Sequence, residues 1–383
     1  MRTTLRNLVE SESGDSVVAF LRARGPRACV IAPGWLRQRI MGERQSGRHS
    51  AVWVEDWEND STPADGVTNF IVAAEDAPRE KALLGALSRL DGVKAYGLFG
   101  HVLPALLSAM NGMAPGHTTK GLKRFAIVCV PRSGSRYLSA LLSRRGVGAP
   151  REHIREPMAH IIAEGNMGFG PAVESLERFG QRNGIFGTKL ISTFLVHASH
   201  RRVAELKQNI EWMVDRGYHL VRLERPVEEA AVSSYIAFQM QKWHFFGEMD
   251  EDARARLNSL EFEDGAAWDE FIRFRAEKVI IDSLARWFDM PSIAYADIET
   301  DADLIVSRLC ELIGADPAAL KPGSAPIPIA TRNESPTYAV FAQRMAALLE
   351  RRAADIVPST ARKLRAIGKL SQSEAEELVA GSG

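Results

Sequence analysis

The residue types best suited to chemistry gather in one short loop that is basic, rich in hydroxyls and contains a glycine. It consists of Arg132, Ser133, Gly134, Ser135 and Arg136. An apolar, β-prone run precedes it at residues 125–130, and a helix-like run follows at 137–142. Such a strand–loop–helix turn points backbone N–H groups at one spot, and the helix dipole adds positive potential there. The sequence therefore predicts a site for a phosphate or a sulfate.

Two familiar phosphate chemistries do not fit this loop. A nucleoside-triphosphate P-loop needs a glycine five positions before Gly134 and a lysine directly after it, and neither is present. A cysteine-dependent phosphatase needs five residues between its thiolate and its arginine, whereas six separate Cys129 from Arg136. Cys129 also falls inside the apolar strand. The loop thus disfavours Walker-type kinases and ATPases as well as cysteine phosphatases.

What remains resembles the 5′-phosphosulfate loop of sulfotransferases that use 3′-phosphoadenosine 5′-phosphosulfate (PAPS). In those enzymes an arginine at a strand end and a serine eight positions later hold the 3′-phosphate of PAPS. Here the strand-like run 218–224 ends at Arg225, and Ser233 lies eight residues further on. Pro226 suits the first turn of a helix, and two turns bring Ser233 to a side that can face the strand. The resemblance therefore accounts for two anion sites.

The surrounding segments narrow the resemblance to the bacterial trehalose-sulfotransferase type. The matching segments are the loop with arginine in place of the commoner lysine, residues 148–152, residues 184–190, and residues 225–233 with the stretch up to 243. The resemblance covers roughly residues 123–345 and does not cover residues 1–115. It implies an α/β protein with a P-loop-NTPase-like parallel sheet flanked by helices, the sulfotransferase fold, preceded here by a smaller N-terminal α/β domain.

The resemblance also assigns roles to residues. Glu152 corresponds to the general base, Lys189 to the lysine that meets the transferring group, and Arg132 to the clamp on the 5′-phosphosulfate. Sulfuryl transfer needs such parts, because a base must take the acceptor's proton and positive charge must meet the leaving oxygen. The implied nucleotide contacts are Arg132, Ser133, Gly134, Ser135, Arg136, Arg225, Ser233 and, by a looser match, Arg332, and the implied acceptor contacts are Glu152, His153, Gln239 and Trp243.

Some assignments leave alternatives open. Arg136 either adds a third cationic contact or lies along the helix surface. The aromatic cluster at residues 243–246 either lines the acceptor pocket or packs in the core or a dimer contact. Ala149 stands where the trehalose enzymes carry a glutamate, so we expect the acceptor hydroxyl to belong to a carbohydrate, a glycolipid or a small metabolite rather than to trehalose itself.

Two rival functions share these motifs. A noncatalytic protein would keep the nucleotide site as a sensor or scaffold, with residues 1–115 as an interaction module. Phosphoryl transfer from ATP would require Mg²⁺ and no 3′-phosphate, and the Arg225 and Ser233 pair argues against it.

Composition and charge are those expected of a soluble enzyme. The 383 residues include 48 basic and 48 acidic ones, so the zero formal net charge gives no global attraction to nucleic acid or to membranes. Three cysteines do not make a disulfide framework. The sequence shows no signal-like or membrane-spanning run. We therefore expect a cytoplasmic enzyme with a small-molecule or glycolipid acceptor, PAPS as donor and no metal, and the resemblance allows a homodimer.

The domain boundary is expected in the polar stretch 111–121, which is rich in Gly, Pro and Thr. Residues 1–115 alternate helix-like and strand-like runs, as a small α/β domain does, and their role is not indicated. Residues 122–350 are expected to form the sulfotransferase domain, and residues 351–383 a helical C-terminal tail.

Overall fold

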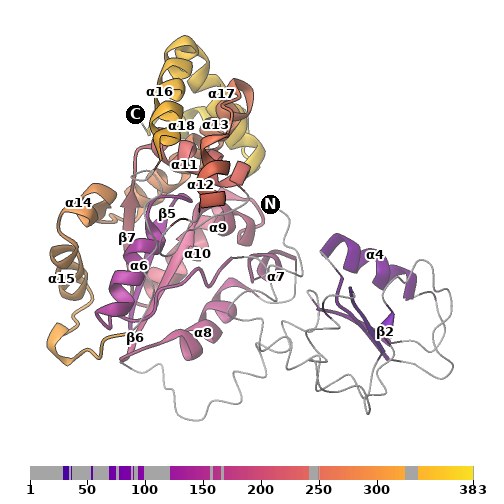
Figure 1. Cartoon of the computed structure of the whole chain (residues 1–383). Coiled ribbons are helices and arrows are strands. Elements are labelled where there is room, and N and C mark those ends of the chain that lie inside the picture. Colours follow the sequence, from indigo (N-terminus) through magenta and orange to yellow (C-terminus); the bar gives the residue numbers. More distant parts are fainter. Residues whose placement is uncertain are drawn as a thin grey trace. The chain divides into compact units, whose positions relative to one another are not determined.

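The computed structural model contains two parallel β-sheets with helices packed against them (Figure 1). The structure describes residues 29–33, 36, 53–54, 69–74, 77–87, 89, 94–98, 121–155, 158–164, 168–240, 249, 251–323 and 335–382. By Cα proximity the chain divides into two compact units, one formed by residues 1–115 with 156–175 and the other by residues 116–155 with 176–383.

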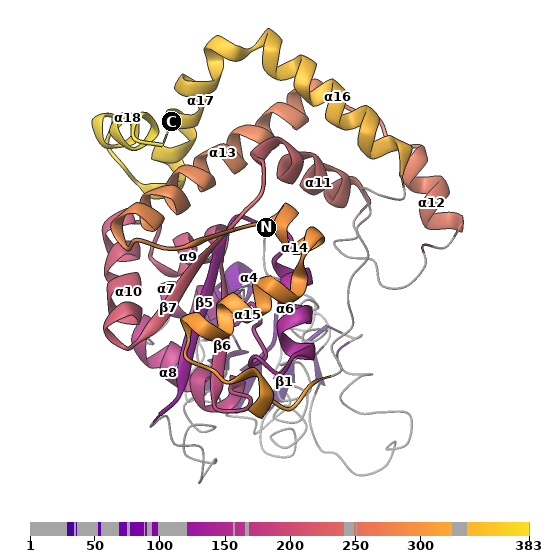
Figure 2. The same ribbon diagram turned by 90° about the vertical axis from the view of Figure 1, so that its left-hand side faces the viewer.

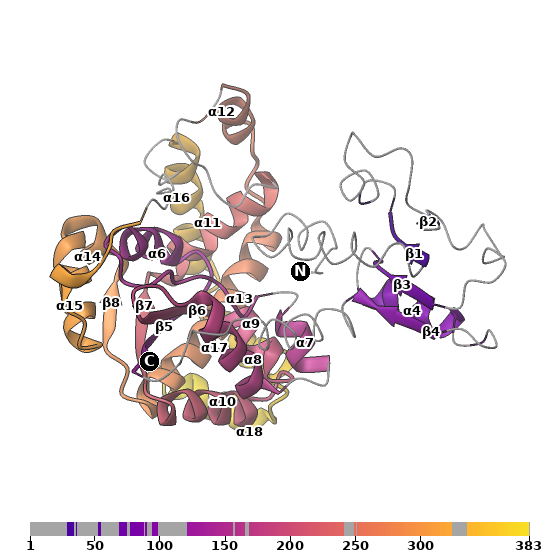
Figure 3. The same ribbon diagram turned by 90° about the horizontal axis from the view of Figure 1, so that it is seen from below.

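The first unit holds a four-stranded sheet in the order β2-β1-β3-β4, which Figure 3 shows with helix α4. The elements are β1 (Cys29–Ile31), β2 (Trp53–Val54), β3 (Asn69–Val72), α4 (Ala77–Leu87) and β4 (Lys94–Gly97). All strand pairs are parallel, and Ile31, Phe70, Val72, Leu83 and Leu87 contribute to a buried core. The predicted N-terminal α/β character is confirmed for these residues. Helix α7 (Met158–Glu164) groups with this unit although it lies far along the chain.

The second unit is built on a parallel sheet in the order β6-β5-β7-β8. Its strands are β5 (Lys123–Cys129), β6 (Ile185–Ile191), β7 (Tyr218–Glu224) and β8 (Ser292–Ala294). The central strand β5 pairs with both β6 and β7, with Ile127 opposite Lys189 and Val128 opposite Arg222. Because the strands run parallel, their carboxyl ends meet at one edge of the sheet, where ligands bind in open α/β proteins.

Helices cover both faces of this sheet, and Figure 2 shows α6, α14 and α15 on one side with α9 and α10 on the other. Apart from α7, the described α-helices that follow β5 are α6 (Ser135–Arg144), α8 (Phe169–Gly180), α9 (Ser192–Ala198), α10 (Val203–Asp215), α11 (Val227–Met240), α12 (Glu251–Asn258), α13 (Asp264–Trp287), α14 (Tyr295–Thr300), α15 (Ala302–Leu312), α16 (Pro336–Arg351), α17 (Ala353–Gly368) and α18 (Gln372–Ala380). Helices α11 and α16 pack on one another and on α13, and α17 also packs on α13.

Strand β5 is apolar because both of its faces are covered, as is usual in parallel sheets. Phe125, Ile127 and Cys129 are fully buried and join a core with α6, β7, α14 and α15. Since side chains alternate along a strand, Ala126 and Val128 point to the other face, and they too are fully buried. The predicted α/β class, with a parallel sheet flanked by helices, is confirmed.

A buried ionic cluster ties the sheet together at the edge opposite the carboxyl ends of the strands. Glu177 on α8 is fully buried and accepts hydrogen bonds from Arg124, Arg216 and the Tyr218 hydroxyl. Arg124 and Tyr218 are register partners near the starts of β5 and β7. Burial raises the pKa of Glu177, but the hydrogen bonds from Arg216, Arg124 and Tyr218 outweigh it, so the net shift is downward. The carboxylate therefore remains charged at neutral pH.

Candidate active site

The loop after β5 has the strand–turn–helix geometry of an anion site. Gly134 is the N-cap of α6 and adopts a left-handed conformation with φ 86°. A Cβ at Gly134 would lie 2.1 Å from the ring of Tyr295, so both the backbone angle and the close approach require glycine. In the described chain no side chain caps α6. The N-terminus of a helix is a place where backbone N–H groups can bind an anion.

The hydroxyls and the thiol around this loop are tied inward. Ser133 is fully buried, and its hydroxyl donates to the Val130 carbonyl at 2.8 Å, which closes the turn. The carbonyl of the buried Ser135 accepts from Ser139 at 2.7 Å. Burial raises the pKa of Cys129 to about 11, although hydrogen bonds with Ser133 and Ser135 act against it. The thiol stays protonated at neutral pH, which agrees with the sequence argument against a cysteine phosphatase.

Arg132 connects this loop to the second predicted anion segment. Its Nε and Nη2 both donate to the Ser233 hydroxyl, at 3.1 and 3.0 Å, across 101 residues of sequence. Burial, followed by the charge of Arg225, lowers the pKa of Arg132 to about 10, so the guanidinium is still protonated at neutral pH. Tyr338, Glu152 and Tyr295 act in the opposite direction on the pKa of Arg132.

Arg225 leaves the end of β7 and is held from several directions. Its Nη1 donates to the Arg132 carbonyl at 3.0 Å, its Nε donates to Glu229 at 3.1 Å, and its Nη2 donates to the Tyr338 hydroxyl at 3.2 Å. Its guanidinium also lies over the ring of Tyr295, 5.0 Å from the centroid. The structure thus brings together Arg132, Arg225 and Ser233, which the sequence had placed in two separate segments.

Glu152 and Lys189, the predicted base and the predicted catalytic lysine, form an ion pair. Lys189 Nζ donates to Glu152 Oε1 at 2.9 Å, and only 5% of the lysine side chain is exposed against 26% of the glutamate. The pair forms because the segment around Arg151 runs along β6, with Arg151 bridged to Thr188 and its carbonyl accepting from Lys189 N at 2.8 Å. The charge of Glu152 also acts to raise the pKa of Arg132, which with Arg225 and Ser233 forms the arginine cluster.

His153 lies beside this pair in a neutral form. Its Nδ1 is 3.2 Å from the Thr188 hydroxyl, and its ring lies 5.0 Å from that of Phe186. Burial, together with the charges of Arg151 and Lys189, lowers the pKa of His153 to about 3. At neutral pH the imidazole can therefore act only as a neutral hydrogen-bonding group.

Four further residues were predicted for the site, namely Arg136, Gln239, Trp243 and Arg332. Arg136 is exposed on the first turn of α6. The Gln239 amide donates to the Glu261 carbonyl at 2.9 Å, and no described contact joins Gln239 to the arginine cluster. Trp243 and Arg332 lie outside the described residues. Their predicted roles, like those of the other site residues, stay predictions.

Three residues of the arginine cluster carried no clear signal in the sequence. They are Glu229, Tyr295 and Tyr338. Glu229 lies in the first turn of α11, where an acidic residue is common, and its carboxylate pairs with Arg225 four residues earlier. Tyr295 begins α14 and Tyr338 lies in the first turn of α16, so only tertiary packing brings them to Arg225.

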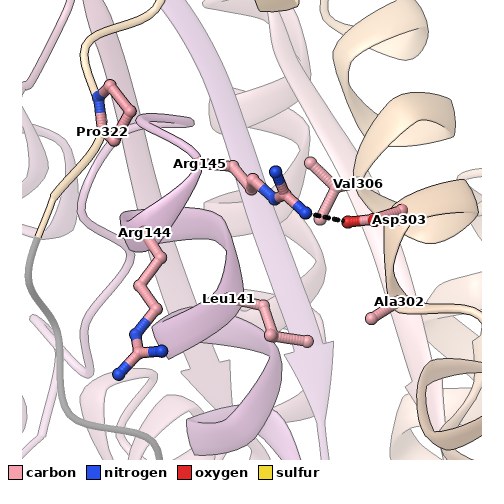
Figure 4. A pocket seen from close by; sticks show the side chains of 7 residues that line it. All are labelled: Leu141, Arg144, Arg145, Ala302, Asp303, Val306 and Pro322. Atoms are coloured by element: carbon pink, nitrogen blue, oxygen red, sulfur yellow. Dashed lines mark hydrogen bonds and ion pairs between the residues drawn. The ribbon is translucent and has the colours of Figure 1, made fainter.

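An open pocket of about 320 Å³ lies elsewhere, between the last turn of α6 and α15 (Figure 4). The ion pair of Arg145 with Asp303 spans it, and its lining includes none of the predicted site residues. Within the described chain, no group of three or more His, Cys, Asp and Glu residues is arranged to hold a metal ion. None of the described helices combines the length and the apolar character that crossing a bilayer requires.

No protein-family model matches the sequence, and neither does any curated protein. Solved structures that resemble the chain include a sulfotransferase from Alicyclobacillus acidocaldarius, the sulfotransferase domain from the curacin biosynthetic pathway, and the sulfotransferase domain from the Synechococcus PCC 7002 olefin synthase. Their sequence identities are 12%, 14% and 15%, and their TM-scores are 0.35, 0.32 and 0.30. The matches cover 66%, 60% and 61% of this chain and 98%, 98% and 90% of those chains. With TM-scores this low, the similarity by itself assigns neither an activity nor a site residue.

Proposed function

We propose that the protein is a sulfotransferase that moves the sulfuryl group of PAPS to a hydroxyl of a carbohydrate, a glycolipid or another small metabolite. The observation that carries this proposal is the cluster of Arg132, Ser233 and Arg225, which joins the loop after β5 to the end of β7. Such a cluster suits a ligand with two separate anionic groups. PAPS has a phosphosulfate at its 5′ end and a phosphate at its 3′ end, whereas ATP carries its charge at one end only.

In this proposal the two ends of the nucleotide bind different elements. The N–H groups at the start of α6, Lys189 and Arg132 hold the 5′-phosphosulfate, while Arg225 and Ser233 hold the 3′-phosphate. The hydrogen bonds from Arg132 to Ser233 run between the two subsites, so a bound nucleotide would compete for them. The donor set therefore fits a nucleotide with two separate anionic groups by charge and by hydrogen-bonding capacity.

Glu152 is the proposed general base for the transfer. The acceptor oxygen bonds to sulfur while the bond from sulfur to the bridging 5′-phosphate oxygen breaks, and the electron pair leaves with 3′-phosphoadenosine 5′-phosphate (PAP). The hydroxyl proton goes to the Glu152 carboxylate. Lys189, 2.9 Å from Glu152 Oε1, compensates the charge of the base and supplies positive charge close to the leaving oxygen. The neutral His153 offers a hydrogen bond to the acceptor.

The nucleotide site is tested by calorimetry with PAP and with 5′-AMP, which lacks the 3′-phosphate. We expect wild-type protein to bind PAP more tightly, and Arg225→Ala to lose roughly 10-fold to 100-fold in PAP affinity, because a charge-assisted arginine–phosphate contact is removed. Arg202→Ala removes the same charge from an exposed position at the start of α10 and should bind PAP like wild type. If wild-type protein shows no preference for PAP, the proposed function is wrong.

Catalysis is tested separately with Glu152→Gln, which keeps the shape of the side chain but cannot accept the proton. We expect this variant to bind PAP and to lose roughly 100-fold or more in transfer from PAPS, as measured by mass spectrometry of sulfated products from an acceptor panel. Undiminished transfer would remove Glu152 as the base. A wild-type protein that binds PAP but sulfates no acceptor would instead favour the noncatalytic sensor or scaffold.

A further inference from the structure

Residues from three helices and from the loop at 132–136 surround Arg225, and we call them its cage. The cage contacts are the Glu229 carboxylate from α11, the Arg132 carbonyl, the ring of Tyr295 from α14 and the Tyr338 hydroxyl from α16. Only 8% of the arginine side chain is exposed. An arginine at a strand end would otherwise sample many rotamers, so these contacts fix its guanidinium before any anion arrives.

The cage leaves the guanidinium with capacity for an anion. A guanidinium has five N–H groups, one on Nε and two on each terminal nitrogen. The described contacts use one on each of the three nitrogens, which leaves one N–H on Nη1 and one on Nη2. Two parallel N–H groups on the terminal nitrogens are the arrangement that binds phosphate oxygens in a bidentate manner.

The members of the cage differ in their effect on charge. Glu229 is an anion, so it cancels part of the positive potential of Arg225. The Tyr338 hydroxyl is neutral, and it accepts from Arg225 Nη2 at 3.2 Å while it donates to the Glu229 carbonyl at 3.1 Å. It therefore restrains the guanidinium without weakening its attraction for an anion. Its place is set by α16, which starts at Pro336 behind the N-cap Ser335 and packs on α11.

We propose that Tyr338 is a positioning residue that holds Arg225 in the orientation required for the 3′-phosphate and so sets the preference for 3′-phosphorylated nucleotides. The proposal rests on the proposed function above and extends it to a residue of α16 that touches the arginine rather than the nucleotide. The neutral hydroxyl acts on the 3′-phosphate through Arg225, so its contribution to 3′-phosphate binding should disappear when Arg225 is removed.

The test uses Tyr338→Phe in the full-length protein, because this change removes only the hydroxyl. Calorimetry with PAP and with 5′-AMP gives the ratio of their dissociation constants, which reports the contribution of the 3′-phosphate. We expect the ratio to fall about tenfold through weaker PAP binding, with 5′-AMP affinity unchanged, since one hydrogen bond to a charged group is lost. Combined with Arg225→Ala, Tyr338→Phe should cause no further loss.

The matched control is Tyr235→Phe. Tyr235 lies on α11, packs against Phe341 of α16 at a ring distance of 5.9 Å, and its hydroxyl bonds the backbone at Glu261 and Glu263. This variant should lower thermal stability and leave the ratio at its wild-type value.

The possible outcomes separate the two proposals. Three results would overturn the role of Tyr338 and leave the sulfotransferase proposal standing. They are a wild-type ratio of the PAP and 5′-AMP dissociation constants in Tyr338→Phe, an equal loss of affinity for both nucleotides, and an undiminished effect of Tyr338→Phe in the Arg225→Ala background. A wild-type protein that does not prefer PAP over 5′-AMP would overturn both.

Discussion

Replacing Glu177 by Gln should destabilise the second unit strongly while leaving its nucleotide site intact. The change removes the charge that two arginines and the Tyr218 hydroxyl share, and the new side-chain amide would point an N–H at these donors. Removing one partner of a buried ion pair costs about 3–5 kcal/mol, and the partial exposure of Arg124 and Arg216, 12% and 25%, favours the lower end. A loss of about 3 kcal/mol corresponds to a Tm lower by roughly 6–12 °C in a unit of this size.

Circular dichroism melts at several pH values test this reasoning. The folded pKa of Glu177 lies below its ordinary value, so its contribution is present above the unfolded pKa and is lost as pH falls through the folded pKa. The Tm difference between wild type and Glu177→Gln should therefore be full at pH 7 and shrink once the pH drops below about 4.3.

An exposed carboxylate elsewhere on the second unit provides the control for the buried Glu177 cluster. Glu211→Gln removes an exposed carboxylate that lies 3.7 Å from Lys207, and its Tm should change by about 1 °C or less. PAP affinity should be unchanged in Glu177→Gln at temperatures well below its Tm, because the cluster lies at the opposite edge of the sheet. A Tm within about 2 °C of wild type at pH 7, where about 6 °C or more is expected, or a difference that grows in acid, would refute the account.

Two further substitutions probe the site itself. Gly134→Ala should weaken PAP binding roughly tenfold or more, because a Cβ there meets the Tyr295 ring at 2.1 Å and the left-handed backbone costs about 1–2 kcal/mol. The control is Gly217→Ala, at φ 83° with no atom within 4 Å of its Cβ. This variant should carry the backbone cost alone and bind PAP like wild type. Glu229→Gln should strengthen PAP binding by about threefold in low-salt calorimetry without changing 5′-AMP affinity. The change keeps an acceptor for Arg225 Nε and removes a negative charge beside the proposed 3′-phosphate site. Weaker PAP binding would show that the charge itself is needed to hold Arg225.

Local patterns were sufficient for the strand before the loop and for the turn into a helix, whereas the parallel sheet was expected from the family resemblance. The apolar run at residues 125–130 predicted a strand, and residues 125–129 form the buried part of β5. The glycine at 134 predicted a tight turn into a helix, and Gly134 is the left-handed N-cap of α6. These features depend on backbone preferences and on burial periodicity, which act over a few residues and can therefore be read from sequence.

Contacts between distant segments could not be predicted in the same way. The expected base, Glu152, and the expected lysine, Lys189, are 37 residues apart, and their ion pair exists because the segment before Glu152 lies along β6. The sequence carries no local record of that pairing. His153 shows the same limit, because its neutral state follows from burial and two neighbouring cations rather than from its position in the chain.

By itself the sequence determined the strand, the glycine turn and the helix around Gly134 and the arginine at a strand end, because each depends on short-range backbone geometry and hydrophobic pattern. Only the tertiary structure decided that the two predicted anion segments meet, with Arg132 hydrogen-bonded to Ser233 and Arg225 enclosed by Tyr295 and Tyr338. The physical reason is that parallel strands place their carboxyl ends at one edge whatever their separation in sequence, and that helices packed from far along the chain then supply the remaining side chains.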